Sequence, residues 1–182
     1  MRAVEIAFLA GWVAFWLYWL VAALSAKRGR IAWGRVVGPR LVIVALVIFV
    51  AHQRAFRHHG IETGPWRAGF GLALFVLGLA WAIWARVHMG RNWGSPMTRK
   101  DEPELVTSGP YRWVRHPIYS GILAAGGGTA IGLDWRWLII VVAVGAYFIY
   151  SARVEERILT EQLPDAYPRY RRRTKMIVPF AF

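Results

Sequence analysis

The stretch PIYSGILAAGGGTAIGLDWRWLIIVVAVGAYFIYSA, residues 117–152, decides the fold of this chain. It contains two apolar segments, 117–133 and 135–152, which only Asp134 separates. About 20 mainly apolar residues are enough for a helix to cross a bilayer. Because the connection is so short, the two helices must run antiparallel as a tight hairpin. The sequence therefore predicts that the chain crosses a membrane here and returns to the level at which it entered.

Three further apolar segments precede this hairpin, at residues 4–25, 36–52 and 68–88. The second is the weakest, because Gly38 and Pro39 interrupt its start and favour a short or tilted span. The first is too long for the apolar core of a signal peptide, so we interpret it as a retained span. With 57% of its 182 residues hydrophobic, the chain is predicted to be an all-α polytopic membrane protein with about five transmembrane helices.

The chain has a formal net charge of +13, and its Lys and Arg residues are distributed unequally between the two sides of the predicted bundle. Eighteen Lys and Arg residues fall on the side that holds the C-terminus, and five fall on the other side. The positive-inside rule then places the N-terminus outside and the C-terminus in the cytoplasm, and we expect an integral protein of a bacterial inner membrane. Cations that lie between apolar segments also argue against nucleic-acid binding.

The residue types exclude some classes of site. The absence of cysteine excludes disulfides and zinc sites built on thiolates. His52, His58 and His59 could bind a metal, but a solvated outer loop is the favoured interpretation, and no metal site is predicted.

A polar block, Gly109-Pro-Tyr-Arg-Trp-Val-Arg-His-Pro-Ile-Tyr-Ser-Gly121, stands at the entrance of the hairpin. Polar groups at a membrane boundary are costly and commonly have a function. His116 precedes a proline and should be extended, whereas Pro117 suits the first turn of a helix. Because the two arms of the hairpin have matched lengths, Glu155 and Glu156 should return close to His116.

A pocket built from these groups would have a defined chemistry. The helix N-terminus would offer free N–H groups to a carboxylate or phosphate, and Tyr111 and Tyr119 would offer aromatic faces to a cation. S-adenosylmethionine is one of several ligands with this combination of charges. Simpler alternatives remain for single residues: His116 could cap the helix, the tyrosines could form an interfacial belt, and Glu156 could be solvated or paired with a basic neighbour.

Three motifs resemble the isoprenylcysteine carboxyl methyltransferase family, in an arrangement that phospholipid methyltransferases share. They are Glu104-Leu-Val-Thr-Ser-Gly-Pro-Tyr111, Arg115-His-Pro-Ile-Tyr-Ser-Gly121 and Glu155-Glu-Arg-Ile-Leu159. The tail that begins with Tyr167-Pro-Arg-Tyr170 is also similar, so that the resemblance covers residues 75–180. Together with the apolar segments, it divides the chain into two N-terminal transmembrane helices in residues 1–66 and a methyltransferase core in residues 67–182.

The resemblance also implies roles for individual residues. S-adenosylmethionine would be bound, and S-adenosylhomocysteine released, by Pro103, Glu104, Leu105, Val106, Tyr111, His116, Pro117, Ile118, Tyr119 and Glu155. Tyr170 and Arg171 would help to close this pocket. As catalytic residues we expect Arg153, which would contact an anionic acceptor group, and Glu156, which would accept a proton if the acceptor is an amine, with His116 as the other candidate for that base. In the prenylcysteine enzymes an arginine one turn before the cofactor glutamate contacts the substrate, and this chain has Ser151 there.

The favoured function is methylation of a carboxylate on a lipophilic, isoprenoid-type acceptor in the membrane. The first alternative is N-methylation of a phospholipid or another amine. The second is a non-enzymatic protein that binds lipid through its basic tail, because Arg171–Arg173 and Lys175 suit the anionic headgroups of the inner leaflet. The oligomeric state is left open.

Overall fold

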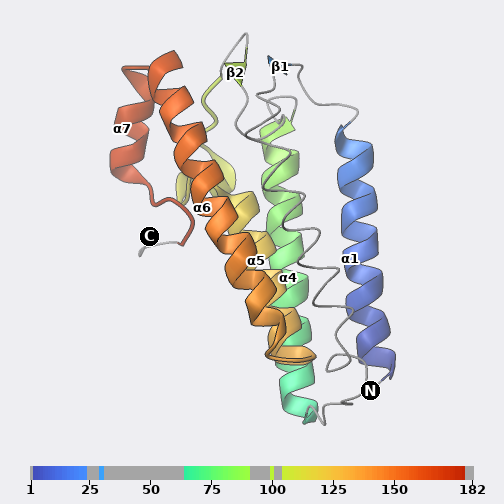
Figure 1. Ribbon diagram of the computed structural model, residues 1–182. Helices are drawn as coiled ribbons and strands as arrows, with labels where there is room; N and C mark the ends of the chain where they lie inside the picture. The colour runs from blue at the N-terminus through green and yellow to red at the C-terminus, as the bar shows by residue number, and fades with distance from the viewer. Residues whose placement is uncertain (1, 24–28, 31–63, 91–98, 101–103, 179–182) are drawn as a thin grey trace.

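The computed structural model describes residues 2–23, 29–30, 64–90, 99–100 and 104–178. Its helices are α1 (Arg2–Ala23), α4 (Pro65–Met89), α5 (Pro117–Gly132), α6 (Trp137–Gln162), α7 (Ala166–Arg173) and the short 3-10 helix η2 (Gly109–Arg112) (Figure 1). Two-residue strands, β1 (Gly29–Arg30) and β2 (Arg99–Lys100), pair antiparallel. The predicted all-α class is confirmed. The predicted segment 36–52 and the three histidines at 52, 58 and 59 lie outside the described residues.

The observed helices follow the predicted apolar segments, and α6 is the one that clearly exceeds its predicted length. Within the described residues, α1, α4 and α6 are long and apolar enough to cross a membrane. Helix α5 has 16 residues and spans about 24 Å, which is short for a bilayer crossing. Helix α6 continues past the predicted end at residue 152 as far as Gln162, because the Glu, Arg and Leu residues that follow favour helix.

The hairpin between α5 and α6 is confirmed, and Asp134 fixes its turn. One Asp134 carboxylate oxygen, Oδ1, accepts a hydrogen bond from the Arg136 backbone N–H at 2.9 Å, and the other, Oδ2, accepts one from Arg136 Nε at 2.6 Å. The Asp134 carbonyl accepts the N–H of Trp137 at 3.0 Å. The single charged residue between the apolar segments thus binds the backbone N–H groups at the start of α6, which the helix itself cannot pair.

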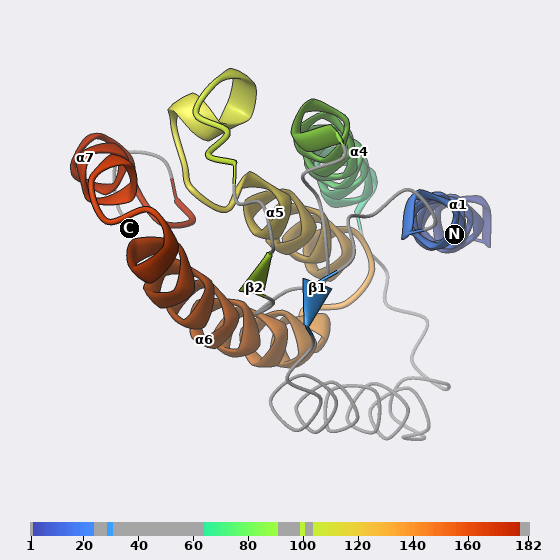
Figure 2. The same cartoon turned by 90° about the horizontal axis from the view of Figure 1, so that it is seen from above.

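Helices α4 and α5 approach so closely that their backbones are almost in contact, and Figure 2 shows α5 held between α4 and α6. Glycines on the facing sides make this possible. A Cβ atom added to Gly78 would lie 2.5 Å from Ala125 N, and one added to Gly128 would lie 2.5 Å from Phe75 N. Small residues at such contacts are typical of helix packing in membranes, where hydrophobic burial does not drive association.

Replacing either of two neighbouring glycines of α5 by alanine should therefore have opposite effects on the stability of the protein. Gly128→Ala should destabilise the protein by about 1–3 kcal/mol, because the added methyl group overlaps the backbone of α4. Gly127→Ala meets no atom within 4 Å and should be neutral or stabilising, since alanine favours helix. Thermal unfolding of both variants in the same detergent measures the difference, and equal midpoints would contradict the observed packing.

Helix α1 is attached to the rest of the protein in the middle and at its C-terminal end. Phe8 and Phe15 are buried and belong to the same core as Phe75 of α4. Trp12 Nε1 donates to Thr129 Oγ1 of α5 at 3.2 Å. Near the end of α1, the buried Arg86 of α4 donates to the Ala22 carbonyl at 2.9 Å. The first predicted span is therefore part of one bundle with the hairpin.

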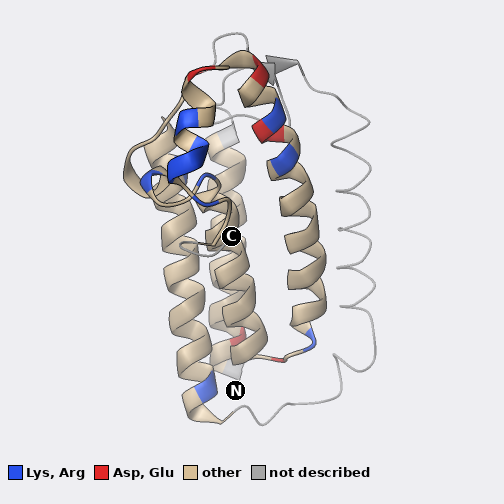
Figure 3. Cartoon of the chain, turned by 90° about the vertical axis from the view of Figure 1, so that its left-hand side faces the viewer, with Lys and Arg blue, Asp and Glu red and all other residues tan. Residues whose placement is uncertain are grey.

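Charged residues gather at one end of this bundle. Figure 3 shows most of them on α7 and on the adjoining end of α6, while the middle parts of the helices carry almost no charged residues. The N-terminal end of α1 lies at the opposite end from α7 (Figure 1). The charged end is the one to which the polar block 109–121 contributes.

Candidate functional site

The polar block is shaped by local backbone requirements before the helix begins. Gly109 has φ of +58°, a region that favours glycine, and the ring of His88 packs where its Cβ would lie, 2.7 Å from His88 Nε2. His116 has φ −125° and ψ 61°, outside the helical region, and α5 begins at Pro117, as predicted from the His-Pro pair. Residues 109–116 thus form a compact turn that sits on the end of α5.

The C-terminal tail pairs with this turn. The Arg115 N–H donates to the Lys175 carbonyl at 2.8 Å, and the His116 N–H donates to the Met176 carbonyl at 3.0 Å. Ser120 Oγ donates to the carbonyl of Ile177. Tail carbonyls therefore accept the N–H groups of Arg115 and His116, which precede α5, while the N–H groups predicted to be free at the helix N-terminus are those that follow Pro117. The tail forms one wall of the site.

Glu156 is the buried centre of an ion-pair cluster. Its Oε1 accepts from Arg115 Nε at 2.6 Å and lies 3.4 Å from His116 Nε2, without hydrogen-bond geometry at the histidine. Its Oε2 lies 3.5 Å from Arg171 Nε. Arg115 also donates to the carbonyls of Arg171 and Thr174, so that one guanidinium joins α6, the tail and the polar block. This position favours a structural role for Glu156, since acting as a base would require it to give up its pairing with Arg115.

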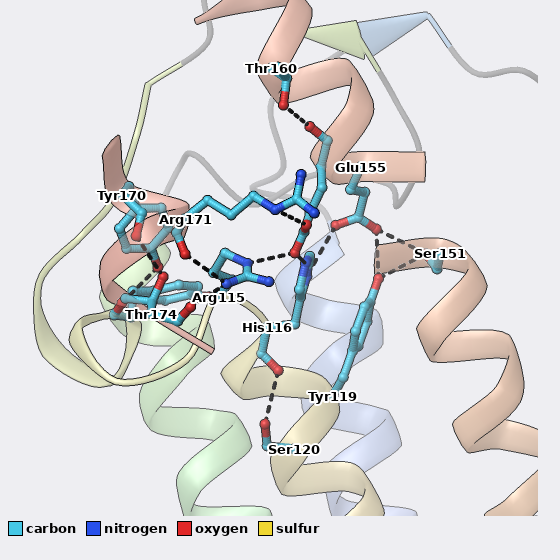
Figure 4. A network of polar contacts seen from close by, with 12 residues as sticks. Arg115, His116, Tyr119, Ser120, Ser151, Glu155, Thr160, Tyr170, Arg171 and Thr174 are labelled. Atoms are coloured by element: carbon cyan, nitrogen blue, oxygen red, sulfur yellow. Dashed lines mark hydrogen bonds and ion pairs between the residues drawn. The ribbon is translucent and has the colours of Figure 1, made fainter. Parts of the chain in front are cut away.

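Glu155 has a different environment, although it is the next residue. Its Oε1 accepts from Tyr119 at 2.6 Å and from Ser151 at 2.9 Å, while its Oε2 lies 3.7 Å from His116 Nδ1 (Figure 4). The Glu155 side chain is 25% exposed, compared with 4% for Glu156. Among the described residues, none donates a hydrogen bond to Oε2. This oxygen is available to a ligand that carries a cation or an N–H donor.

The tyrosines contribute more through their hydroxyl groups than through their faces. The Tyr119 ring lies parallel to the rings of His116 and Phe148, at centroid distances of 5.3 and 4.3 Å, and is largely buried. Tyr111 is 3% exposed, and its carbonyl accepts from the Tyr170 hydroxyl at 2.7 Å. The tyrosine faces that were expected to contact a cation are therefore buried in this structure.

Tyr111 and Tyr170, which lie outside the spanning helices, are neutral groups. Burial raises the pKa of Tyr111 and of Tyr170 well above the ordinary value for a phenol. Neither hydroxyl ionises at physiological pH, so Tyr170 stays a hydrogen-bond donor to the polar block.

The remaining predicted site residues differ in how close they come to this network. Pro117 is buried at the start of α5, Ile118, Leu105 and Val106 are half-buried, and Glu104 is exposed. Pro103 lies outside the described residues. Arg153 is exposed, and because two residues turn a helix by about 200°, it points away from the side of α6 that carries Glu155. The structure therefore does not bring Arg153 to the network, and its predicted contact with the acceptor remains a prediction.

Two residues that hydrogen-bond the glutamates, Ser151 and Arg115, were not predicted as site residues. The spacing of Ser151 and Glu155, four residues apart on one helix, was the available signal for the first. Nothing in the sequence indicated that Arg115 would bind tail carbonyls 56 and 59 residues away.

These features define a helical membrane protein with a polar site where the hairpin, the tail and the block 109–121 meet. Residues 66–166 match the family model described as phospholipid methyltransferase. The chain belongs to this family.

Individual relatives show the same family at moderate similarity. Protein-S-isoprenylcysteine O-methyltransferase B of Arabidopsis thaliana is 31% identical over 125 residues, which cover 66% of this chain and 64% of the relative. A methanethiol S-methyltransferase of a Pseudomonas species is 29% identical over 146 residues, covering 75% of this chain and 56% of the relative. The chain thus spans less than two thirds of the length of either protein.

A solved structure has the same fold. It is that of the eukaryotic intramembrane Ras methyltransferase ICMT, an isoprenylcysteine carboxyl methyltransferase. The TM-score is 0.61 at 24% sequence identity, and the match covers 79% of this chain and 53% of that chain. This likeness shows the membrane fold that was expected.

Proposed function

We propose that this protein transfers a methyl group from S-adenosylmethionine to a lipophilic acceptor in the membrane. The observation that carries the proposal is the Glu155 oxygen Oε2, which accepts no hydrogen bond from the described residues and lies 3.7 Å from His116 Nδ1 at the polar end of the hairpin. The site fits the methyl donor, because a partly exposed carboxylate suits an ammonium group next to a sulfonium. When bound, that donor supplies an activated methyl group. The sequence of this chain and its family membership support the same function.

The residues of this chain would act mainly by positioning. Displacement at a methyl carbon requires the nucleophile and the leaving sulfur to be in line, so that orientation and exclusion of water carry most of the catalytic effect. The Arg115–Glu156 pair fixes the turn that carries His116, and the tail covers that turn from the outside. Glu155 would hold the donor by its ammonium group within this rigid frame.

A carboxylate is the acceptor that the network favours. It needs no proton removed before it attacks, whereas an amine does. Glu156, the residue predicted as base, is bound to Arg115 at 2.6 Å and is buried. The relatives named as isoprenylcysteine O-methyltransferases support an isoprenoid-type carboxylate, and the name of the family model keeps a phospholipid amine as the second candidate.

The finer placement in the membrane also belongs to this proposal. Tyr167 and Tyr170 face inward on α7, while Arg171, Arg172 and Arg173 are exposed. Such a helix can rest on anionic headgroups through its arginines, at about 1 kcal/mol for each basic residue near the surface. With the count of basic residues on each side, this supports a site at the cytoplasmic face of a bacterial inner membrane.

Calorimetry of the purified protein in detergent tests the proposal. Titration with S-adenosylhomocysteine should show saturable binding, and a protein that only binds lipid should show none. If the protein is folded by circular dichroism and gives no heat of binding, the proposal of a methyltransferase fails.

Labelling identifies the chemical class of the acceptor. A lipid extract of the host would be incubated with the protein and with donor labelled in its methyl group. Carboxyl methyl esters release the label in alkali, and methylated amines retain it. We expect release, and retained label would support the phospholipid amine instead.

A further inference from the structure

Two hydroxyl groups hold one oxygen of Glu155. Tyr119 and Ser151 both lie within hydrogen-bonding distance of Oε1, at 2.6 and 2.9 Å, and their own oxygens are 3.0 Å apart. Ser151 is fully buried, so no solvent competes for its hydroxyl. Hydrogen bonds to a charged acceptor are stronger than those between neutral groups. The carboxylate is therefore held at one end and accessible at the other.

The hydroxyl of Tyr119 is itself held in place. Its ring lies within 5° of the plane of His116 and within 9° of the plane of Phe148. Phe148, Ser151 and Glu155 follow one another at spacings of three and four residues, which puts them on one side of α6. A ring stacked in this way cannot move away without breaking both contacts, so the Tyr119 hydroxyl is held at a fixed position beside Glu155.

The residue next to Ser151 on α6 also carries a hydroxyl group, but that group does not bind Glu155. Tyr150 precedes Ser151 on α6 and is 43% exposed, so its hydroxyl is on another side of the same helix. Among the described residues, only the hydroxyls of Tyr119 and Ser151 donate hydrogen bonds to the Glu155 carboxylate.

We propose that Ser151 and Tyr119 are positioning residues that hold Oε1 of Glu155 and thereby aim Oε2 at the ammonium group of the methyl donor. The proposal rests on the proposed function. It assigns to Ser151 a role in the binding of the donor and not in contact with the acceptor, because its hydroxyl is buried and directed at Glu155.

Two ligands, one with and one without the amino-acid part of the donor, distinguish this positioning role from a general loss of the binding site. S-adenosylhomocysteine contains the amino-acid part, and 5′-methylthioadenosine lacks it. Ser151→Ala should weaken binding of S-adenosylhomocysteine about tenfold, as expected for one lost hydrogen bond to a charged group, and should leave binding of methylthioadenosine unchanged. Tyr119→Phe should act in the same direction, and Ser151→Thr, which keeps the hydroxyl, should restore affinity.

Tyr150→Phe is the matched control, since it removes an exposed hydroxyl one residue away and should change neither affinity. The KM for the donor should rise in Ser151→Ala while kcat at saturating donor stays within about twofold, because the lost contact acts on binding. Equal weakening of both ligands, or no weakening of either, would overturn the proposal. Absence of binding by the unmodified protein would instead overturn the proposed function, so that the two failures are distinct.

Discussion

A Glu156→Ala variant should lose about 3–5 kcal/mol of unfolding free energy, the largest effect expected for a single side chain of this protein. The substitution leaves the Arg115 guanidinium, 8% exposed, without the carboxylate that lies 2.6 Å away. An unpaired buried charge costs much more than the pair contributes, because its desolvation is no longer offset. The same change also frees Arg171 Nε, 3.5 Å from the other Glu156 oxygen.

Denaturant or thermal unfolding in detergent measures this loss, and the neighbouring residue is the control. Glu155→Ala should cost less stability, since that side chain is more exposed and pairs with neutral hydroxyls. A double variant, Arg115→Ala with Glu156→Ala, should recover part of the loss because no buried charge remains unpaired. A Glu156→Ala protein as stable as the parent would show that the cluster does not hold the tail in place.

For Glu155→Gln the expected result is the opposite: near-normal stability and a loss of about 100-fold in affinity for S-adenosylhomocysteine. Glutamine has the same shape, so the hydroxyls of Ser151 and Tyr119 keep an acceptor. The negative charge is lost, and a hydrogen bond to a charged group is worth about 1.5–3 kcal/mol, or roughly tenfold to more than 100-fold in affinity. Calorimetry at one ionic strength measures the change.

Glu161→Gln provides the control for this charge effect, because Glu161 is an exposed glutamate on the same helix. It should bind as the parent does. If the two variants bound equally well, Glu155 would not be the ammonium-binding group, and the proposed site would have to lie elsewhere.

The sequence predicts the level of the site in the bundle but not its internal contacts. Equal arms and a connection of a few residues are sufficient to return Glu155 and Glu156 to the level of His116. The distances from the His116 ring nitrogens to the carboxylates, 3.7 Å for Glu155 and 3.4 Å for Glu156, confirm this prediction. Adjacent residues on a helix point about 100° apart, so the two glutamates necessarily face different partners. Which of them would meet Arg115 depends on the tilt of α6 and on the path of the tail, and neither is encoded in local sequence.

The structure adds contacts that local chemistry did not predict, and distant segments supply them. Open tyrosine faces were predicted, but Phe148 stacks on Tyr119. Just before α5, the carbonyls of Lys175 and Met176 accept the N–H groups of Arg115 and His116. Buried polar groups are almost always paired, so a strong donor at a helix end is as attractive to the chain itself as to a ligand. The extension of α6 to Gln162 has a simpler cause, since helix propensity continues after hydrophobicity ends.

The pairing of residues 113–116 with the tail also sets an order of events during synthesis. Synthesis runs from the N-terminus, so the helices α1, α4, α5 and α6 are made before Lys175 and Met176, and the turn at Arg115 must wait for its last hydrogen-bond partners. A nascent chain can therefore have all four of these helices and still lack one wall of its polar site. A chain that stops before Lys175 would leave the N–H groups of Arg115 and His116 without the carbonyls that accept them in the folded protein.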